Sequence, residues 1–121
     1  MPVAAVLFLS SDLMFSSRVM GAAKAQGVAI LQVADQSALA DKIAADCQLA
    51  LIDLSLDRLN LAAAVRAIKA GAPSAEVVAY GPHVDEAALA DAQEAGCDQV
   101  LTRGQFNKQY AELLANVAGS K

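Results

Sequence analysis

Four apolar runs of this sequence each end in residues that could take part in chemistry. In chain order these are Ser10 to Asp12, Asp53, Gly81 to His83, and Arg103. A carboxylate such as Asp53 can accept hydrogen bonds from hydroxyls, bind a hard cation or be phosphorylated. A guanidinium such as Arg103 can bind that carboxylate or an external anion. Which chemistry is available depends on whether the fold brings these positions together.

The elements that must position these residues alternate along the chain, five times over. We expect strands at residues 3–9, 28–33, 49–53, 76–80 and 99–102. We expect helices at residues 13–26, 37–46, 59–70, 85–95 and 106–118. Several strands lack polar alternation, which is typical of a parallel sheet covered by helices on both faces. The pattern predicts one α/β domain over residues 1–121, flavodoxin-like and doubly wound, with strand order 2-1-3-4-5 and polar residues gathered at the carboxyl ends of the strands.

Composition excludes several classes of function. The net charge is −4 and the nine Lys and Arg residues are scattered, so we expect no nucleic-acid binding. The apolar run at residues 3–9 is too short to cross a bilayer and no basic segment precedes it, so we expect no membrane association and a cytoplasmic location. Cys47 and Cys97 have no His or Cys at ligand spacing, so we expect reduced structural thiols and no cofactor.

Four segments resemble the strand ends of a response-regulator receiver domain of the CheY-like family. They are VLFLSSDLM, LALIDLSL, AYGPHVDEAAL and AGCDQVLTRGQF, and the spacing is similar over the whole chain. The resemblance implies that Asp53 stands at the phosphoacceptor position. It also implies that a receiver would hold Mg²⁺ with an acidic pair, and here Ser10 and Ser11 occupy those positions. Two neutral hydroxyls cannot replace two negative charges, and phosphoryl transfer depends mainly on positioning and electrostatic stabilisation.

Three further positions depart from the receiver pattern. Gly81 stands where the family has a Ser or Thr, Arg103 where it has a Lys, and Val100 where it has the aromatic switch residue of the fifth strand. Glycine offers no hydroxyl, the arginine fork is not interchangeable with an ammonium, and valine can pack but cannot swing a polar tip. The resemblance is therefore to a degenerate, or pseudo-receiver, type.

The remaining carboxylates decide whether any metal site survives. Asp12 lies one position late, and we expect its side chain to cap the first helix; only Asp12 and Asp53 could contribute to a metal site. The simplest interpretation of Asp53 is a strand-end carboxylate satisfied by hydroxyls and loop amides. A sharper hypothesis has Asp53 accepting bonds from Ser10 or Ser11 and pairing with Arg103.

The leading functional hypothesis is an atypical stand-alone receiver in signal transduction, acting as a phosphorylation-independent protein-interaction module. The resemblance implies a partner surface on helix 85–95, strand 99–102 and helix 106–118, with a homodimer as an open alternative. We expect no enzymatic activity: His83 is a lone loop histidine, and no nucleophile-elbow pattern surrounds Ser10 and Ser11.

Two alternatives stay open. One is a small-molecule binder in which the loop SSDLMFSS cradles a phosphate, as in flavin binding, with Tyr80 near the rim of the site. The other is a receiver that is still phosphorylated on Asp53.

Overall fold

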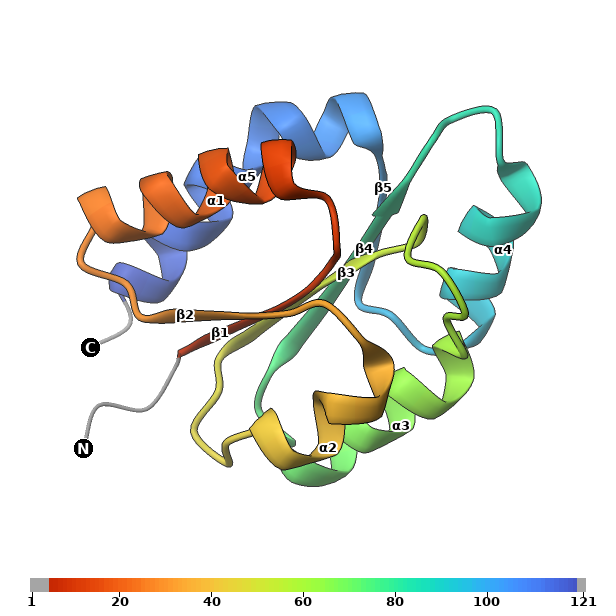
Figure 1. The fold of residues 1–121 in the computed structure, drawn as a ribbon, viewed down its shortest axis with the longest axis horizontal. Coiled ribbons are helices and arrows are strands. Elements are labelled where there is room, and N and C mark those ends of the chain that lie inside the picture. The colour runs from red at the N-terminus through yellow and green to blue at the C-terminus, as the bar shows by residue number, and fades with distance from the viewer. Residues whose placement is uncertain (1–4, 120–121) are drawn as a thin grey trace.

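Five parallel strands form one sheet in the computed structural model, which describes residues 5–119 (Figure 1). The strands are β1 (Val6–Leu9), β2 (Ile30–Val33), β3 (Leu49–Asp53), β4 (Glu76–Gly81) and β5 (Gln99–Thr102). Their order in the sheet is β2-β1-β3-β4-β5, and every neighbouring pair is parallel. The predicted fold and strand order are confirmed. Residues 3 and 4 of the predicted first strand lie outside the described residues.

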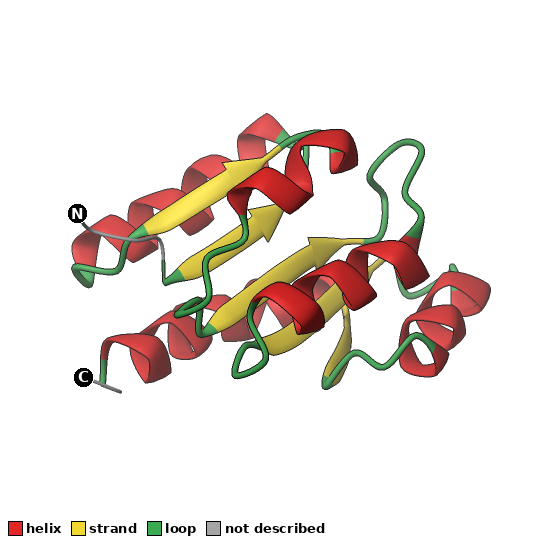
Figure 2. Cartoon of the chain, turned by 90° about the horizontal axis from the view of Figure 1, so that it is seen from below, coloured by secondary structure: helices red, strands yellow, loops and turns green. Residues whose placement is uncertain are grey.

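Helices connect the strands and cover both faces of the sheet (Figures 1 and 2). They are α1 (Leu13–Ala25), the 3-10 turn η1 (Gln36–Ala38), α2 (Leu39–Lys42), α3 (Leu61–Gly71), α4 (Glu86–Glu94) and α5 (Arg103–Ala118). Helices α1 and α5 pack on one face, and α2, α3 and α4 pack on the other. The second helix is much shorter than predicted, because Ile43 already has extended backbone angles.

The last helix begins three residues earlier than predicted. Thr102 caps it by accepting a bond from the Gln105 N–H, and the Gln105 side chain accepts from the Thr102 N–H in return. This reciprocal capping box has the sequence signature Thr-x-x-Gln, which is present in the chain and could have predicted the start. Arg103 is therefore the first residue of a helix and not a loop residue.

Strand pleating decides which side chains reach the α1 and α5 side of the sheet. Successive side chains of a strand point to opposite faces. In β1, Val6 and Phe8 pack with α1 and α5, whereas Leu7 and Leu9 pack with α2, α3 and α4. Ser10 continues the first set. By the same alternation Asp53 follows Leu49 and Leu51, and Tyr80 follows Val78, so all three residues point to one side at one end of the sheet.

The two thiols are held away from solvent to different degrees. Cys47 is buried and Cys97 is half-buried. Burial raises the pKa of both, that of Cys97 to about 11, so both stay protonated near neutral pH.

Between residues 5 and 119, none of the helices combines the length and the apolar character needed to span a membrane.

Candidate functional site

A buried carboxylate and a buried hydroxyl form the centre of the site. Asp53, at the end of β3, is 3% exposed, and Ser10, just after β1, is fully buried. The Ser10 hydroxyl donates to Asp53 Oδ2 at 2.8 Å, and the Ser55 N–H donates to Asp53 Oδ1 at 2.9 Å. Both carboxylate oxygens are thus engaged by the protein, as a buried charge requires. This arrangement satisfies the carboxylate with a hydroxyl and a loop amide, as the sequence predicted.

Ser10 is itself fixed from several directions. Its Oγ accepts from the Asp12 N–H at 3.1 Å, and its carbonyl accepts from Gln32 Nε2 at 2.8 Å. Gln32, on β2, also donates to Ser16 Oγ at 2.8 Å. Hydrogen bonds to Gln32 and Asp53 therefore connect Ser10, at the end of β1, to both neighbouring strands, β2 and β3. Ser11, by contrast, is exposed and makes no hydrogen bond with a described residue.

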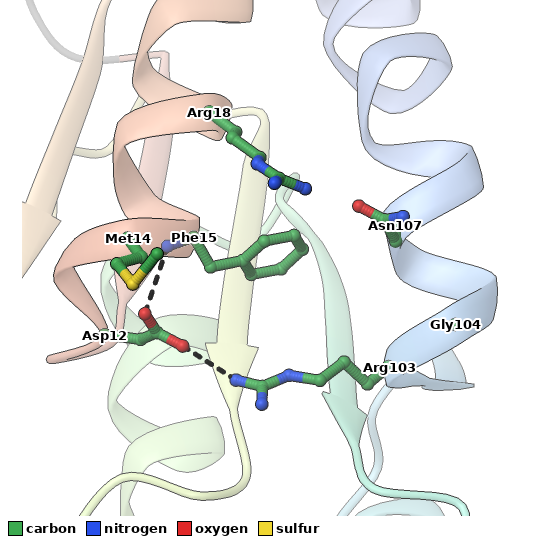
Figure 3. Close-up of a pocket in the computed structure, with 7 residues that line it drawn as sticks. All are labelled: Asp12, Met14, Phe15, Arg18, Arg103, Gly104 and Asn107. Atoms are coloured by element: carbon green, nitrogen blue, oxygen red, sulfur yellow. Dashed lines mark hydrogen bonds and ion pairs between the residues drawn. The ribbon is translucent and has the colours of Figure 1, made fainter.

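Asp12 caps the first helix, as predicted. Its Oδ1 accepts from the Phe15 N–H at 3.0 Å, and its Oδ2 accepts from Arg103 Nη2 at 2.8 Å (Figure 3). The proposed pairing of Arg103 with Asp53 is wrong. Because α5 starts at Arg103, this side chain leaves the first turn of α5 and reaches across to the start of α1, while Ser10 and Ser55 already occupy the Asp53 oxygens.

Gly81 and Val100, which depart from the receiver pattern, both lie in packed surroundings. Gly81 is buried, and a Cβ placed there would lie 3.1 Å from Leu54 Cβ, so a larger side chain would require Leu54 to move. Val100 is half-buried and packs with the core on the α2, α3 and α4 side. His83 is exposed in the loop before α4.

Tyr80 is the residue of this site that sequence reasoning misplaced. It was expected near the rim, but it is fully buried and its ring stacks on Phe106 at a centroid distance of 4.0 Å and an angle of 1°. Burial raises the pKa of the Tyr80 hydroxyl, and the nearby Asp53 carboxylate raises it further. Ser10 lies close enough to oppose that shift, but the contact lacks hydrogen-bond geometry, and the hydroxyl has no partner among the described residues. The alternation from Val78 would have placed Tyr80 inside.

The donors present do not fit the magnesium ion that the resemblance implies. Mg²⁺ takes octahedral oxygen ligands and relies on carboxylates with accessible oxygens. All four carboxylate oxygens of Asp12 and Asp53 already accept hydrogen bonds from the protein. Within residues 5–119, no three His, Cys, Asp or Glu side chains are grouped so that they could hold a metal ion.

Comparison with solved structures matches the chain to receiver domains along nearly its whole length. The receiver domain of NtrX from Brucella abortus is 17% identical, with a TM-score of 0.71, and the match covers 96% of this chain and 99% of that one. The chain has the receiver-domain fold.

Two other receiver-fold structures are equally similar. A response regulator from Thermotoga maritima is 16% identical, with a TM-score of 0.71 and coverage of 98% of this chain and 100% of that one. The receiver domain of sensor histidine kinase PA1611 from Pseudomonas aeruginosa, with magnesium coordinated in its active-site cleft, is 18% identical, with a TM-score of 0.73 and coverage of 95% and 97%. A scan against protein-family models finds no match, and a search of curated proteins finds no significant relative. The chain thus shares the receiver fold with these structures at 16–18% sequence identity.

The hydroxyl of Ser10 should contribute more to stability than the hydroxyl of Ser11. Ser10→Ala removes a hydrogen bond to a buried charge, and we expect the free energy of unfolding to fall by about 2 kcal/mol. Ser11→Ala is the matched control, because Ser11 is exposed, and it should change stability by less than about 0.5 kcal/mol. Urea denaturation of both variants measures the difference. Equal effects of the two substitutions would contradict the assigned hydrogen bond.

The unpaired hydroxyl of Tyr80 should cost stability. Tyr80→Phe removes a buried polar group without a partner, and we expect the free energy of unfolding to rise by about 1 kcal/mol. Because the folded pKa lies above the unfolded one, wild-type stability should be complete below about pH 10 and fall above it; the variant should fall less. Thermal melts from pH 7 to 11 test both points, with Tyr110→Phe, at a partly exposed tyrosine, as control. A less stable Tyr80→Phe protein would count against this account.

Proposed function

We propose that this receiver-fold chain is a signalling module that binds a protein partner and works without phosphorylation. The observation that carries the proposal is the burial of Asp53, whose two oxygens accept hydrogen bonds from the Ser10 hydroxyl and the Ser55 N–H. A phosphoacceptor needs a carboxylate oxygen that the phosphodonor can reach and nearby positive charge for the incoming phosphoryl group, and Asp53 is only 3% exposed.

Neither requirement is met around Asp53. Both Asp53 oxygens are buried and hydrogen-bonded, so a phosphodonor would have to move Ser10 or the loop at Ser55 to reach one of them. Arg103, which stands where the receiver family has a Lys, forms an ion pair with Asp12 at 2.8 Å. The same bonds that satisfy the buried aspartate therefore work against its phosphorylation.

The proposed partner surface is the face formed by α4, β5 and α5. Helix α4 and its cap carry a group of exposed acidic residues: Asp85, Glu86, Asp91 and Glu94. Val84, just before this helix, is 77% exposed. An acidic surface with an exposed apolar residue favours a partner with a basic patch beside an apolar one. A second copy of the chain would bring like charges together at this helix, so we favour a different protein over a homodimer.

Treatment with a small phosphodonor tests the central claim. After incubation with acetyl phosphate and Mg²⁺, we expect the intact mass to show no added phosphoryl group, because both oxygens of Asp53 are buried and hydrogen-bonded. An ordinary receiver domain treated in parallel should gain one. A phosphoryl group that appears on this chain and is lost in an Asp53→Asn variant would overturn the proposal in favour of a working phosphoacceptor.

A further inference from the structure

A pocket of about 430 Å³ lies between the first turns of α1 and α5, and Asp53 is not among the residues that line it. Asp12, the N-cap of α1, lines it together with Met14, Phe15 and Arg18 of α1, and Arg103, Gly104 and Asn107 line it from α5 (Figure 3). The volume falls in the range of sites that bind small molecules. The proposed partner surface on α4, β5 and α5 does not account for this pocket.

The pocket carries positive charge in an acidic protein. Arg18 points into the gap between the two helices, and between residues 5 and 119 it has no ion pair or hydrogen bond (Figure 3). Arg103 is neutralised by Asp12, so one arginine charge is left over in the lining, whereas the whole chain has a net charge of −4. Two parallel N–H groups of a guanidinium match the geometry of a carboxylate or phosphate. The unpaired Arg18 thus selects for an anion.

Helix α5 adds donors of the same kind. The backbone N–H groups of Arg103 and Gly104 belong to its first turn, where helices leave N–H groups without an intrahelical partner and carry partial positive charge. Gly104 has no side chain to shield them, and the Asn107 amide points into the same gap (Figure 3). The start of α1 is different, because the Asp12 carboxylate caps it and would repel an anion. The predicted phosphate-cradling role of the loop at residues 10–17 is therefore not supported at its own helix.

Phe15 and Met14 give the α1 side of the pocket an apolar part, and the Phe15 ring lies between Arg18 and Arg103 (Figure 3). The Phe15 ring extends from α1 into the gap and is held by edge contacts to Tyr80, Phe106 and Tyr110, with centroid distances of 5.8, 5.5 and 6.0 Å. Met14 beside it is 84% exposed. A rigid aromatic ring and a flexible thioether form a surface on which a flat apolar group can pack.

We propose that this pocket binds a small organic anion. Its phosphate or carboxylate group contacts Arg18, Asn107 and the first turn of α5, and its aromatic or apolar part packs on Phe15 and Met14. Because the pocket joins the first and last helices, a bound anion would hold α1 and α5 together.

Three probes separate the parts of this proposal: phenyl phosphate, benzoate and inorganic phosphate. Isothermal titration calorimetry at low salt should show saturable binding of phenyl phosphate or benzoate, with a dissociation constant of about 1 mM or tighter. The probe that binds more tightly shows whether the site prefers a phosphate or a carboxylate group. Inorganic phosphate should bind more weakly, because it lacks the ring. Binding of inorganic phosphate as tight as that of phenyl phosphate would overturn the apolar part, and no saturable binding of either aromatic probe would overturn the whole.

A pair of arginine variants tests the location. Arg18→Gln removes the unpaired guanidinium and should weaken binding of the better probe by about tenfold. Arg66→Gln changes the net charge equally at an exposed arginine of α3, on the other face of the sheet, and should leave binding unchanged. Equal weakening in both variants would mean non-specific attraction and would overturn the site. Circular dichroism spectra of both variants check that they are folded.

Discussion

The hydrogen bond from Ser10 to Asp53 is the interaction on which the functional end of this molecule depends. A carboxylate at 3% exposure is tolerable only if its oxygens have partners, and here the first strand supplies one and the loop after the third strand supplies the other. The bond also fixes Ser10, whose Oγ in turn holds the Asp12 N–H at the entry to α1. The Ser10 hydroxyl thus both satisfies a buried carboxylate and holds the start of α1, at the carboxyl end of the central strands.

The same bond supports the proposal that this receiver fold works without phosphorylation. In a site with several acidic residues, mutual repulsion between carboxylates must be relieved by a cation. With Ser10 beside it, Asp53 is the one buried carboxylate among residues 5–119, so no such repulsion arises at this site. The ion pair between Asp12 and Arg103 satisfies the second carboxylate separately, nearer the surface. Each of the two carboxylates thus has its own partner: Asp53 pairs with Ser10 in the buried site, and Asp12 pairs with Arg103 where the side chains are half-exposed.

Much of the fold could be predicted because it depends on repetition. Alternating apolar strands and Ala-rich helices specify a doubly wound sheet, and its strand order follows from few topological choices. The pairing of Asp53 with Ser10 also follows from the sequence, since both end neighbouring strands on the same face. The partner of Arg103 could not be predicted in the same way, because it depends on where α5 begins. Tyr80 was misplaced for a related reason: its position at a strand end suggested the rim, but pleating points it at Phe106.

The contact between Asp12 and Arg103 joins positions 91 residues apart, at the starts of the first and last helices. Its ion pair is half-exposed, whereas β1 and β3 beneath it are completely buried. Separation of the two helix ends would break this ion pair and the contacts of Phe15 with Phe106 and Tyr110 but would leave the strand pairing intact, so this corner should exchange its amide protons sooner than the central strands. Long-range closures of this kind also form late during folding, because the intervening chain must be ordered first. The corner that closes last as the chain folds is thus also the one that opens first in the native state.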